Sequence, residues 1–218
     1  MLVEKKAAWV TGANSMIGKA ICQRLDNKFQ VLGHHGTSQG NLTDDATVKE
    51  AVERAFLPHG SLDLMVCCAG GNTGLSENDN CIDISMEDFH TIFDKNLMTA
   101  IMCCRHVIPR MMRQKRGSII FIGSAIVGNP REDGQIATYA MAKAALHEYT
   151  IHLARQLRVH NITVNCVAPS STEESSDMHN LARVAVPYEI GDLVAAISDN
   201  TYMSGQIIRL DGGKHWVN

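Results

Sequence analysis

The chain has 218 residues, 45% of them hydrophobic and 20% charged, so it can bury one sizeable core and is expected to form a single domain over residues 1–218. Its net charge of −3 offers no basic surface of the kind that nucleic acid or an anionic membrane selects. The N-terminal residues contain neither a signal-peptide pattern nor an apolar run near the roughly 18 residues that span a bilayer, so we expect a cytoplasmic protein without nucleic-acid or membrane partners.

Short, β-rich apolar runs alternate with segments of helical period along the chain. Strands are expected at residues 7–11, 29–32, 62–68, 118–123, 162–166 and 206–210. A helix should start near Ser15, the longest helical stretch covers residues 85–115, and another covers residues 139–160. Pro109 is expected to kink or interrupt the longest stretch. This alternation predicts an α/β fold, a Rossmann-type doubly wound parallel sheet flanked by helices.

Four loop-like runs punctuate this pattern, at residues 33–40, 70–80, 129–138 and 170–177. Three of them follow predicted strands. In open α/β sheets the ligand crevice lies beyond the carboxyl ends of the strands, so these loops should gather around one pocket.

Cysteine and histidine spacing does not indicate a metal centre. The seven cysteines include two adjacent pairs, at positions 67–68 and 103–104, which fit neither a disulfide framework nor a C-x-x-C metal spacing. The ten histidines form no H-E-x-x-H arrangement. We therefore expect reduced cysteines packed in the core and no metal.

The first predicted strand runs into Thr-Gly-Ala-Asn-Ser-Met-Ile-Gly at residues 11–18. The start of the following helix presents free backbone N–H groups and a positive dipole end, which together suit a pyrophosphate. A strand-to-helix turn also needs glycine for conformational reasons alone, and the spacing misses the G-x-G-x-x-G fingerprint. The segment by itself leaves both interpretations open.

Tyr139 and Lys143 are four residues apart on a predicted helix, which places the phenol and the ammonium on one face, one turn apart. A free tyrosine titrates near ~10, so it donates a proton at neutral pH only where a nearby cation stabilises the phenolate. Lys143 can supply that cation and can also reach ribose hydroxyls. Alone, this spacing occurs by chance on many ordinary helix faces.

Together, these segments resemble the short-chain dehydrogenase/reductase family, in a shortened form similar to its 3-oxoacyl-ACP reductase-like members. The family's T-G-x-x-x-G-x-G matches residues 11–18, with Met16 in place of the middle glycine, and its Y-x-x-x-K matches residues 139–143. Ser124 lies fifteen positions before Tyr139, slightly farther than is usual, and Asn96 matches the asparagine in the family's long helix. The resemblance implies a catalytic tetrad of Asn96, Ser124, Tyr139 and Lys143.

Further matches extend the resemblance over nearly the whole chain, and two of them depart from the family pattern. Cys68 replaces an asparagine of N-N-A-G, and Ser170 replaces the glycine of N-x-V-x-P-G. A helix and much of a strand are missing between residues 33 and 40. The segment between Pro169 and Ser204 is also reduced, so the helices covering the substrate should be small.

The resemblance implies NAD(P) as cofactor. In Rossmann folds an acid about 20 positions beyond the glycine turn favours NAD(H), and residues 32–35 contain none. We therefore predict NADP(H) in preference to NAD(H), with His34, His35, Thr37 and Ser38 as donors to the 2′-phosphate. The expected cofactor-binding residues are Gly12, Asn14, Ser15, Met16, Ile17, Gly18, His34, His35, Asn41, Leu42, Ala69, Gly70, Tyr139, Lys143, Pro169, Ser170 and Thr172.

The implied activity is reduction of a small-molecule carbonyl, or oxidation of the corresponding alcohol, with Tyr139 as proton donor. A 3-oxoacyl thioester is one candidate substrate, although the acidic Glu173, Glu174 and Asp177 do not favour a highly anionic carrier. The alternative is a non-catalytic NAD(P)-binding regulatory protein, since a fold alone does not imply chemistry. The resemblance also implies a homodimer or homotetramer that pairs residues 85–115 and 139–160 across two-fold axes.

Overall fold

The apolar runs form a sheet of six parallel strands in the computed structural model, which describes residues 5–57, 59–72, 81–130, 136–170 and 183–214. The strand order is β2-β1-β3-β4-β5-β6. Each predicted strand is present, with ends within three residues of the expected ones. The strands are β1 Lys6–Thr11, β2 Phe29–His34, β3 Leu64–Cys67, β4 Gly117–Ile122, β5 Ile162–Pro169 and β6 Ile207–Leu210.

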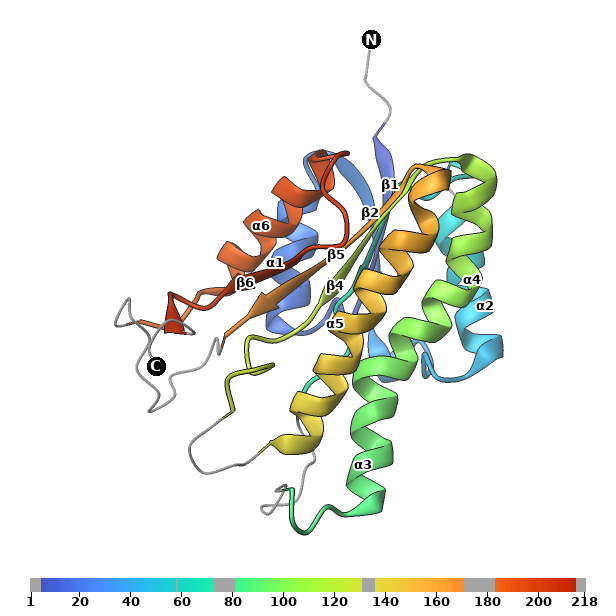
Figure 1. The fold of residues 1–218 in the computed structure, drawn as a ribbon. Coiled ribbons are helices and arrows are strands. Elements are labelled where there is room, and N and C mark those ends of the chain that lie inside the picture. Colours follow the sequence, from blue (N-terminus) through green and yellow to red (C-terminus); the bar gives the residue numbers. More distant parts are fainter. Residues whose placement is uncertain (1–4, 58, 73–80, 131–135, 171–182, 215–218) are drawn as a thin grey trace.

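Helices cover both faces of the sheet (Figure 1). Helices α1 (Met16–Leu25) and α6 (Pro187–Asp199) pack together on one face, and α2 (Asp45–Phe56), α4 (Thr99–Gln114) and α5 (Ala137–Leu157) lie on the other. This arrangement confirms the predicted Rossmann-type doubly wound fold. The carboxyl ends of the strands, where such folds bind ligands, all lie at one edge of the sheet.

Side-chain caps define where several helices begin. The hydroxyl of Ser15 accepts a hydrogen bond from the backbone N–H of Gly18 at the start of α1, and Asp44 caps α2 in the same way. Ser85 caps α3 (Met86–Phe93). Each cap satisfies one of the N–H groups that a first helical turn leaves without an intrahelical acceptor.

The long helical stretch is irregular at Asn96, whereas we expected a kink or an interruption at Pro109. Helix α3 passes into a π-helical turn, Asp94–Met98, before α4 continues to Gln114 with Pro109 inside it. The Asn96 side chain donates to the carbonyl of Ile92 at 3.0 Å and so competes with the backbone ladder. Helix α4 continues through Pro109, so the proline does not interrupt it.

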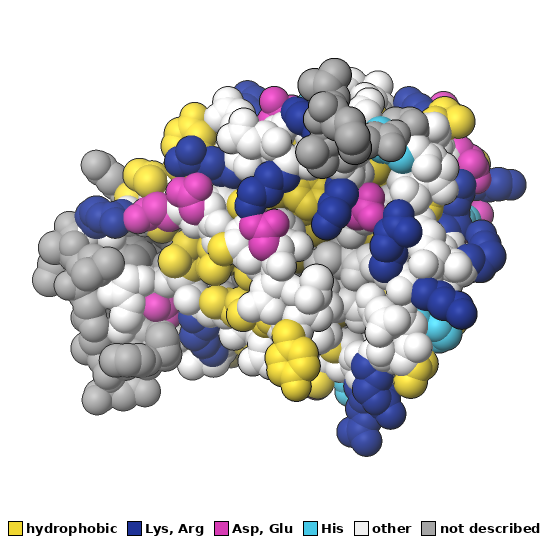
Figure 2. Space-filling view, turned by 90° about the horizontal axis from the view of Figure 1, so that it is seen from above, with side chains coloured by type: hydrophobic (Ala, Val, Ile, Leu, Met, Phe, Trp, Pro, Cys, Tyr) yellow, Lys and Arg dark blue, Asp and Glu magenta, His cyan; other side chains and the backbone are white. Residues whose placement is uncertain are grey.

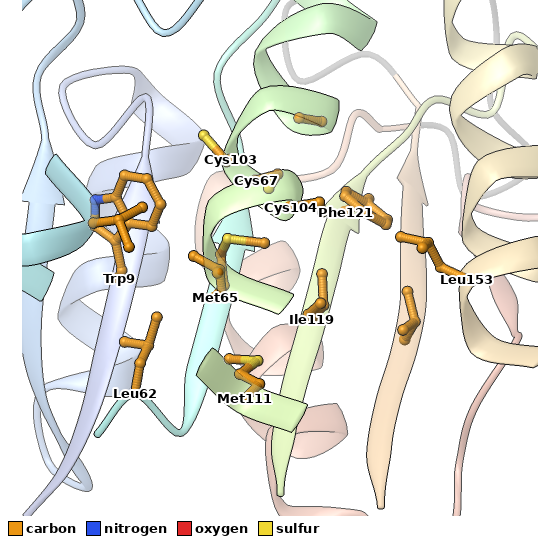
Figure 3. Close-up of a cluster of buried hydrophobic side chains, with 14 of the residues drawn as sticks. Trp9, Leu62, Met65, Cys67, Cys103, Cys104, Met111, Ile119, Phe121 and Leu153 are labelled. Atoms are coloured by element: carbon orange, nitrogen blue, oxygen red, sulfur yellow. The ribbon is translucent and has the colours of Figure 1, made fainter. Parts of the chain in front are cut away.

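Two apolar clusters fill the spaces between the sheet and its helices. Figure 3 shows the larger cluster, in which Trp9, Met65 and Phe121 lie on the face of the sheet that α2, α4 and α5 cover. The adjacent cysteines Cys103 and Cys104 are fully enclosed here, as expected for packing residues. Burial raises the pKa of the Cys103 thiol well above its ordinary value, so this thiol is held in its unreactive protonated form.

The shortened segment after β2 contains only a single 3₁₀ turn, Gly36–Ser38. The ring of His34 closes this connection, because its Nε2 lies 3.1 Å from the carbonyl oxygen of Gly40 and its edge packs against Trp9. Burial lowers the pKa of His34. Within the described residues, β2 is therefore the last strand at this side of the sheet.

Charged side chains are interspersed over the surface. Figure 2 shows basic and acidic groups side by side on much of one face. Arg24 pairs with Asp192 between α1 and α6 at 2.8 Å, an exposed contact of the kind that adds little stability. Among the helices that the structure describes, none has both the length and the apolar character needed to cross a bilayer.

Candidate active site

Tyr139 and Lys143 lie on the first turns of α5, which passes over the carboxyl end of β4. Lys143 is only 4% exposed, and its Nζ donates a 2.8 Å hydrogen bond to the carbonyl of Ile122, the last residue of β4. The same Nζ is 5.6 Å from the centre of the Tyr139 ring. The ammonium of Lys143 is therefore fixed over the aromatic ring of Tyr139.

Ser124 follows β4 after one intervening residue, so it lies close to the carbonyl that holds Lys143. Its Oγ accepts a 3.3 Å hydrogen bond from the backbone N–H of Ile126. Because Ser124 Oγ acts as the acceptor in this bond, its hydroxyl proton can be donated to another acceptor. A substrate oxygen placed here would meet a ready-made donor.

Asn96 is fully buried and fastens the helix irregularity to the loop after β3. Its Oδ1 accepts from the N–H of Gly71, and its Nδ2 donates to the carbonyl of the same residue, both at 2.9 Å. Gly70, with φ +142°, has no room for a side chain, since a Cβ would lie 2.5 Å from Asn96 Oδ1 and 3.5 Å from Lys143 Nζ. The structure thus brings Asn96 and Lys143 together around Gly70, and the ring of Tyr139 faces the same Lys143 Nζ.

The turn from β1 into α1 is tight enough to form a cradle for an anion. Gly12 has φ +65°, and a Cβ there would lie 2.8 Å from the backbone of Ala69. A Cβ on Gly18 would lie 2.2 Å from the carbonyl oxygen of Gly12. The N–H groups of Met16 and Ile17 open the helix and have no intrahelical acceptors. This turn fits the pyrophosphate of a dinucleotide.

Two departures from the family pattern leave this cradle intact. The Met16 side chain is 56% exposed, and α1 begins normally at that residue. The hydroxyl of Thr11 accepts from the N–H groups of Cys68 and Ala69, both at 3.1 Å, which braces the end of β3 against β1 without an asparagine. Burial raises the pKa of the Cys68 thiol to about 11.

Only some of the residues predicted to bind the adenosine half of the cofactor are exposed. Asn14, Ser15, Asn41 and His35 are exposed, and the N–H of His35 donates to Gln39 Oε1. The side chains of His34 and Leu42 are buried, with exposed fractions of 2% and 4%.

The proposed donation from the His34 ring to a 2′-phosphate therefore disagrees with the structure, because that ring packs against Trp9 and Gly40. Leu42 can reach a ligand only through its backbone. On the nicotinamide side, Pro169 is buried and the N–H of half-buried Ser170 donates to Leu210 O. Thr172, Glu173, Glu174 and Asp177 lie outside the described residues.

Sequence reasoning missed two residues close to the site. His147, one turn beyond Lys143, is 7% exposed, and its Nε2 has no hydrogen-bond partner among the described residues. Burial, together with the charges of Arg209 and Lys143, lowers its pKa to about 4. The i, i+4 spacing from Lys143 could have indicated His147. Arg209 lies on the last strand, β6, and it is near the site only because β6 lies two strands from β4 in the sheet.

Comparisons with known proteins place the chain in a family. A family model described as short chain dehydrogenase matches residues 30–184. The chain belongs to the short-chain dehydrogenase family. It is therefore an NAD(P)-dependent oxidoreductase, and the alternative of a non-catalytic binding protein is set aside.

Similar proteins and solved structures cover most or all of the chain. The chain is 31% identical over 191 residues to cyclohexanol dehydrogenase of Rhodococcus sp., covering 80% of this chain and 71% of that protein. It is 30% identical over 250 residues to 3-oxoacyl-[acyl-carrier-protein] reductase FabG of Escherichia coli, covering both in full. The structure titled "ElxO with NADP Bound" superposes with a TM-score of 0.85 over 98% of this chain and all of that one, at 20% identity, which shows a shared fold.

Proposed function

We propose that this short-chain dehydrogenase interconverts a ketone and a secondary alcohol. The bound nicotinamide supplies or accepts the hydride. In the reductive direction Tyr139 donates its phenolic proton to the carbonyl oxygen, while the Ser124 hydroxyl donates a hydrogen bond to the same oxygen. The observation that carries this proposal is the buried Lys143 ammonium, held by Ile122 O at 2.8 Å and 5.6 Å from the Tyr139 ring.

Lys143 keeps the charges in balance during the reaction. When Tyr139 has given up its proton, the phenolate lies beside a fixed cation, so no solvent reorganisation is needed to stabilise it. Asn96 keeps Gly70 and Gly71 in place around that cation through its hydrogen bonds to Gly71. The role proposed for Asn96 in the tetrad is therefore to fix the backbone beside Lys143.

The named relatives support a secondary alcohol or its ketone as substrate. One is called a cyclohexanol dehydrogenase and another a 3-oxoacyl-[acyl-carrier-protein] reductase; the first name contains a secondary alcohol and the second a ketone. The substrate of this chain is proposed to be a small molecule of that class. We also propose that residues 1–218 form one domain of a cytoplasmic protein.

NADP(H) is proposed as the preferred cofactor. Residues 33–40 contain no acid that would repel a 2′-phosphate. The ring of His35 is exposed at this position, directly after β2, and can donate to a phosphate. A neighbour of the same fold carries NADP in its title.

A homodimer or homotetramer is proposed from the side chains on the outer face of α5. Met141 and Ile151 are 37% and 43% exposed there. Burying such apolar side chains between two copies of the chain would remove them from water.

A ketone screen tests the proposed activity. Oxidation of NADPH would be followed by absorbance with cyclohexanone, a 3-oxoacyl thioester and a set of hydroxysteroid ketones, and the reverse reaction with the matching alcohols. Turnover with at least one secondary alcohol or ketone is expected. Absence of turnover with both cofactors over the whole set would contradict the proposal.

A further inference from the structure

Arg209 reaches from the edge of the sheet to the turn that carries Ser124. It lies on β6, where it pairs with Ala168 of β5, and β5 in turn pairs with β4. Paired residues of parallel strands project from the same face, so the small Ala168 leaves room for the arginine stem to cross β5. The Arg209 Nη1 donates to Ala125 O at 3.2 Å, and Nη2 donates to Val127 O at 2.8 Å.

This guanidinium is half-buried, and none of the ion pairs between described residues includes it. His147, on α5, lies within reach of the charges of both Arg209 and Lys143. A cation that is partly removed from water is costly unless hydrogen bonds compensate for the lost hydration. Here the compensation comes from the two carbonyls of the turn.

One of those carbonyls belongs to the peptide group that contacts Ser124. The carbonyl of Ala125 and the N–H of Ile126 are parts of a single planar peptide unit. Arg209 holds the oxygen of this unit, while its N–H donates to Ser124 Oγ at 3.3 Å. Rotation of that peptide plane would break both contacts together, so the two hydrogen bonds fix the Ser124 side chain through one rigid group. Polarisation of the peptide by the guanidinium also strengthens the second bond.

We propose that Arg209 is a positioning residue for Ser124, acting through the peptide between Ala125 and Ile126. It orients the serine hydroxyl so that the proton of the hydroxyl points away from the turn and toward the substrate oxygen. This inference rests on the proposed function, in which Ser124 donates to that oxygen. Arg209 itself touches neither substrate nor cofactor in this account.

A double-mutant cycle separates positioning from general stability. Arg209→Met removes both donors and keeps the stem, and Arg209→Lys keeps the charge with a single donor point. Both would be made in the wild type and in Ser124→Ala. Arg116→Met, which breaks a 3.0 Å pair with Asp63 away from the site, is the matched control. The measurements are kcat and KM for the ketone of highest turnover, NADPH affinity by fluorescence, and thermal midpoint.

The expected result is a loss of about ten- to a hundredfold in kcat for Arg209→Met, the size that small misplacements of reacting groups produce. NADPH affinity should stay within about twofold, and Arg209→Lys should lose less. In the Ser124→Ala background the same change should cost less than about threefold, because residues in one network are not additive. The Arg116→Met control should match the wild type in kcat.

Two other outcomes distinguish a failure of the proposed function from a failure of the positioning role. A wild-type rate in Ser124→Ala, or no turnover in the wild type, would overturn the proposed function and this inference with it. A large loss in Ser124→Ala with equal, additive losses from Arg209→Met in both backgrounds would overturn the positioning role alone. If Arg209→Met fails to fold, Arg209→Lys in both backgrounds decides by the same criterion.

Discussion

Two adjacent glycines, Gly70 and Gly71, allow the packing around Lys143 to be tested with a matched pair of variants. Both have positive φ angles, +142° and +131°. A Cβ on Gly70 would lie 2.5 Å from Asn96 Oδ1, whereas one on Gly71 would meet no atom of the described residues within 4 Å. Gly71→Ala therefore introduces backbone strain alone, and Gly70→Ala introduces a comparable strain together with a clash against a buried amide.

The strain common to both variants should cost about 1–3 kcal/mol. In Gly70→Ala the displaced Asn96 also loses hydrogen bonds while buried, which costs about 1–3 kcal/mol more. Urea unfolding would measure this difference. Turnover should drop in Gly70→Ala, since the same Cβ would lie 3.5 Å from Lys143 Nζ, and should be largely retained in Gly71→Ala. Equal destabilisation and equal activity of the two variants would refute this reasoning.

Three further predictions concern acid stability, cofactor choice and assembly. His147 has a folded-state pKa lowered to about 4 from 6.5, so the unfolded chain binds more protons between these values and stability should decrease as pH is lowered from 6.5 to 4. Replacing His147 by Met should flatten the urea midpoint over this range relative to the wild type, and an unchanged slope would argue against a buried neutral imidazole. Fluorescence titration should show tighter binding of NADPH than of NADH, with the preference reduced in His35→Ala; tighter NADH binding that His35→Ala leaves unchanged would reverse the assignment. Light scattering at micromolar concentration should give a mass of two or four chains, and a mass of one chain would count against the oligomer.

The parts of the fold that could be predicted from sequence are those set by local pattern. Parallel strands buried on both faces need continuous apolar runs, and residues 118–123 show such a run and form β4 within one residue. The irregular turn at Asn96 could not be predicted from local sequence pattern. A proline in the sequence is a recognisable signal for helix interruption. Here, however, the Asn96 side chain donates a hydrogen bond to the Ile92 carbonyl, and the orientation of this side chain depends on the position of Gly71, to which it also donates.

The candidate site shows the same division between local and long-range information. The spacing of Tyr139 and Lys143 placed both on one helix face, as the structure has them. The burial of His34 was not visible in sequence, because it depends on packing against Trp9 and on the closure of the short loop at Gly40. Arg209 was missed because it is 85 residues from Ser124 and becomes a neighbour of its turn only through the order β4-β5-β6.

Single-turnover reduction by Tyr139→Phe tests the central claim most directly. The variant keeps the ring beside Lys143 and removes only the proton donor, so thermal midpoint and NADPH affinity should match the wild type. The rate of NADPH oxidation with the best ketone from the screen should decrease by about 10²–10⁴, the range for losing a general acid. A Tyr139→Phe enzyme that reduces the ketone at close to the wild-type rate would contradict the assignment of Tyr139 as the proton donor.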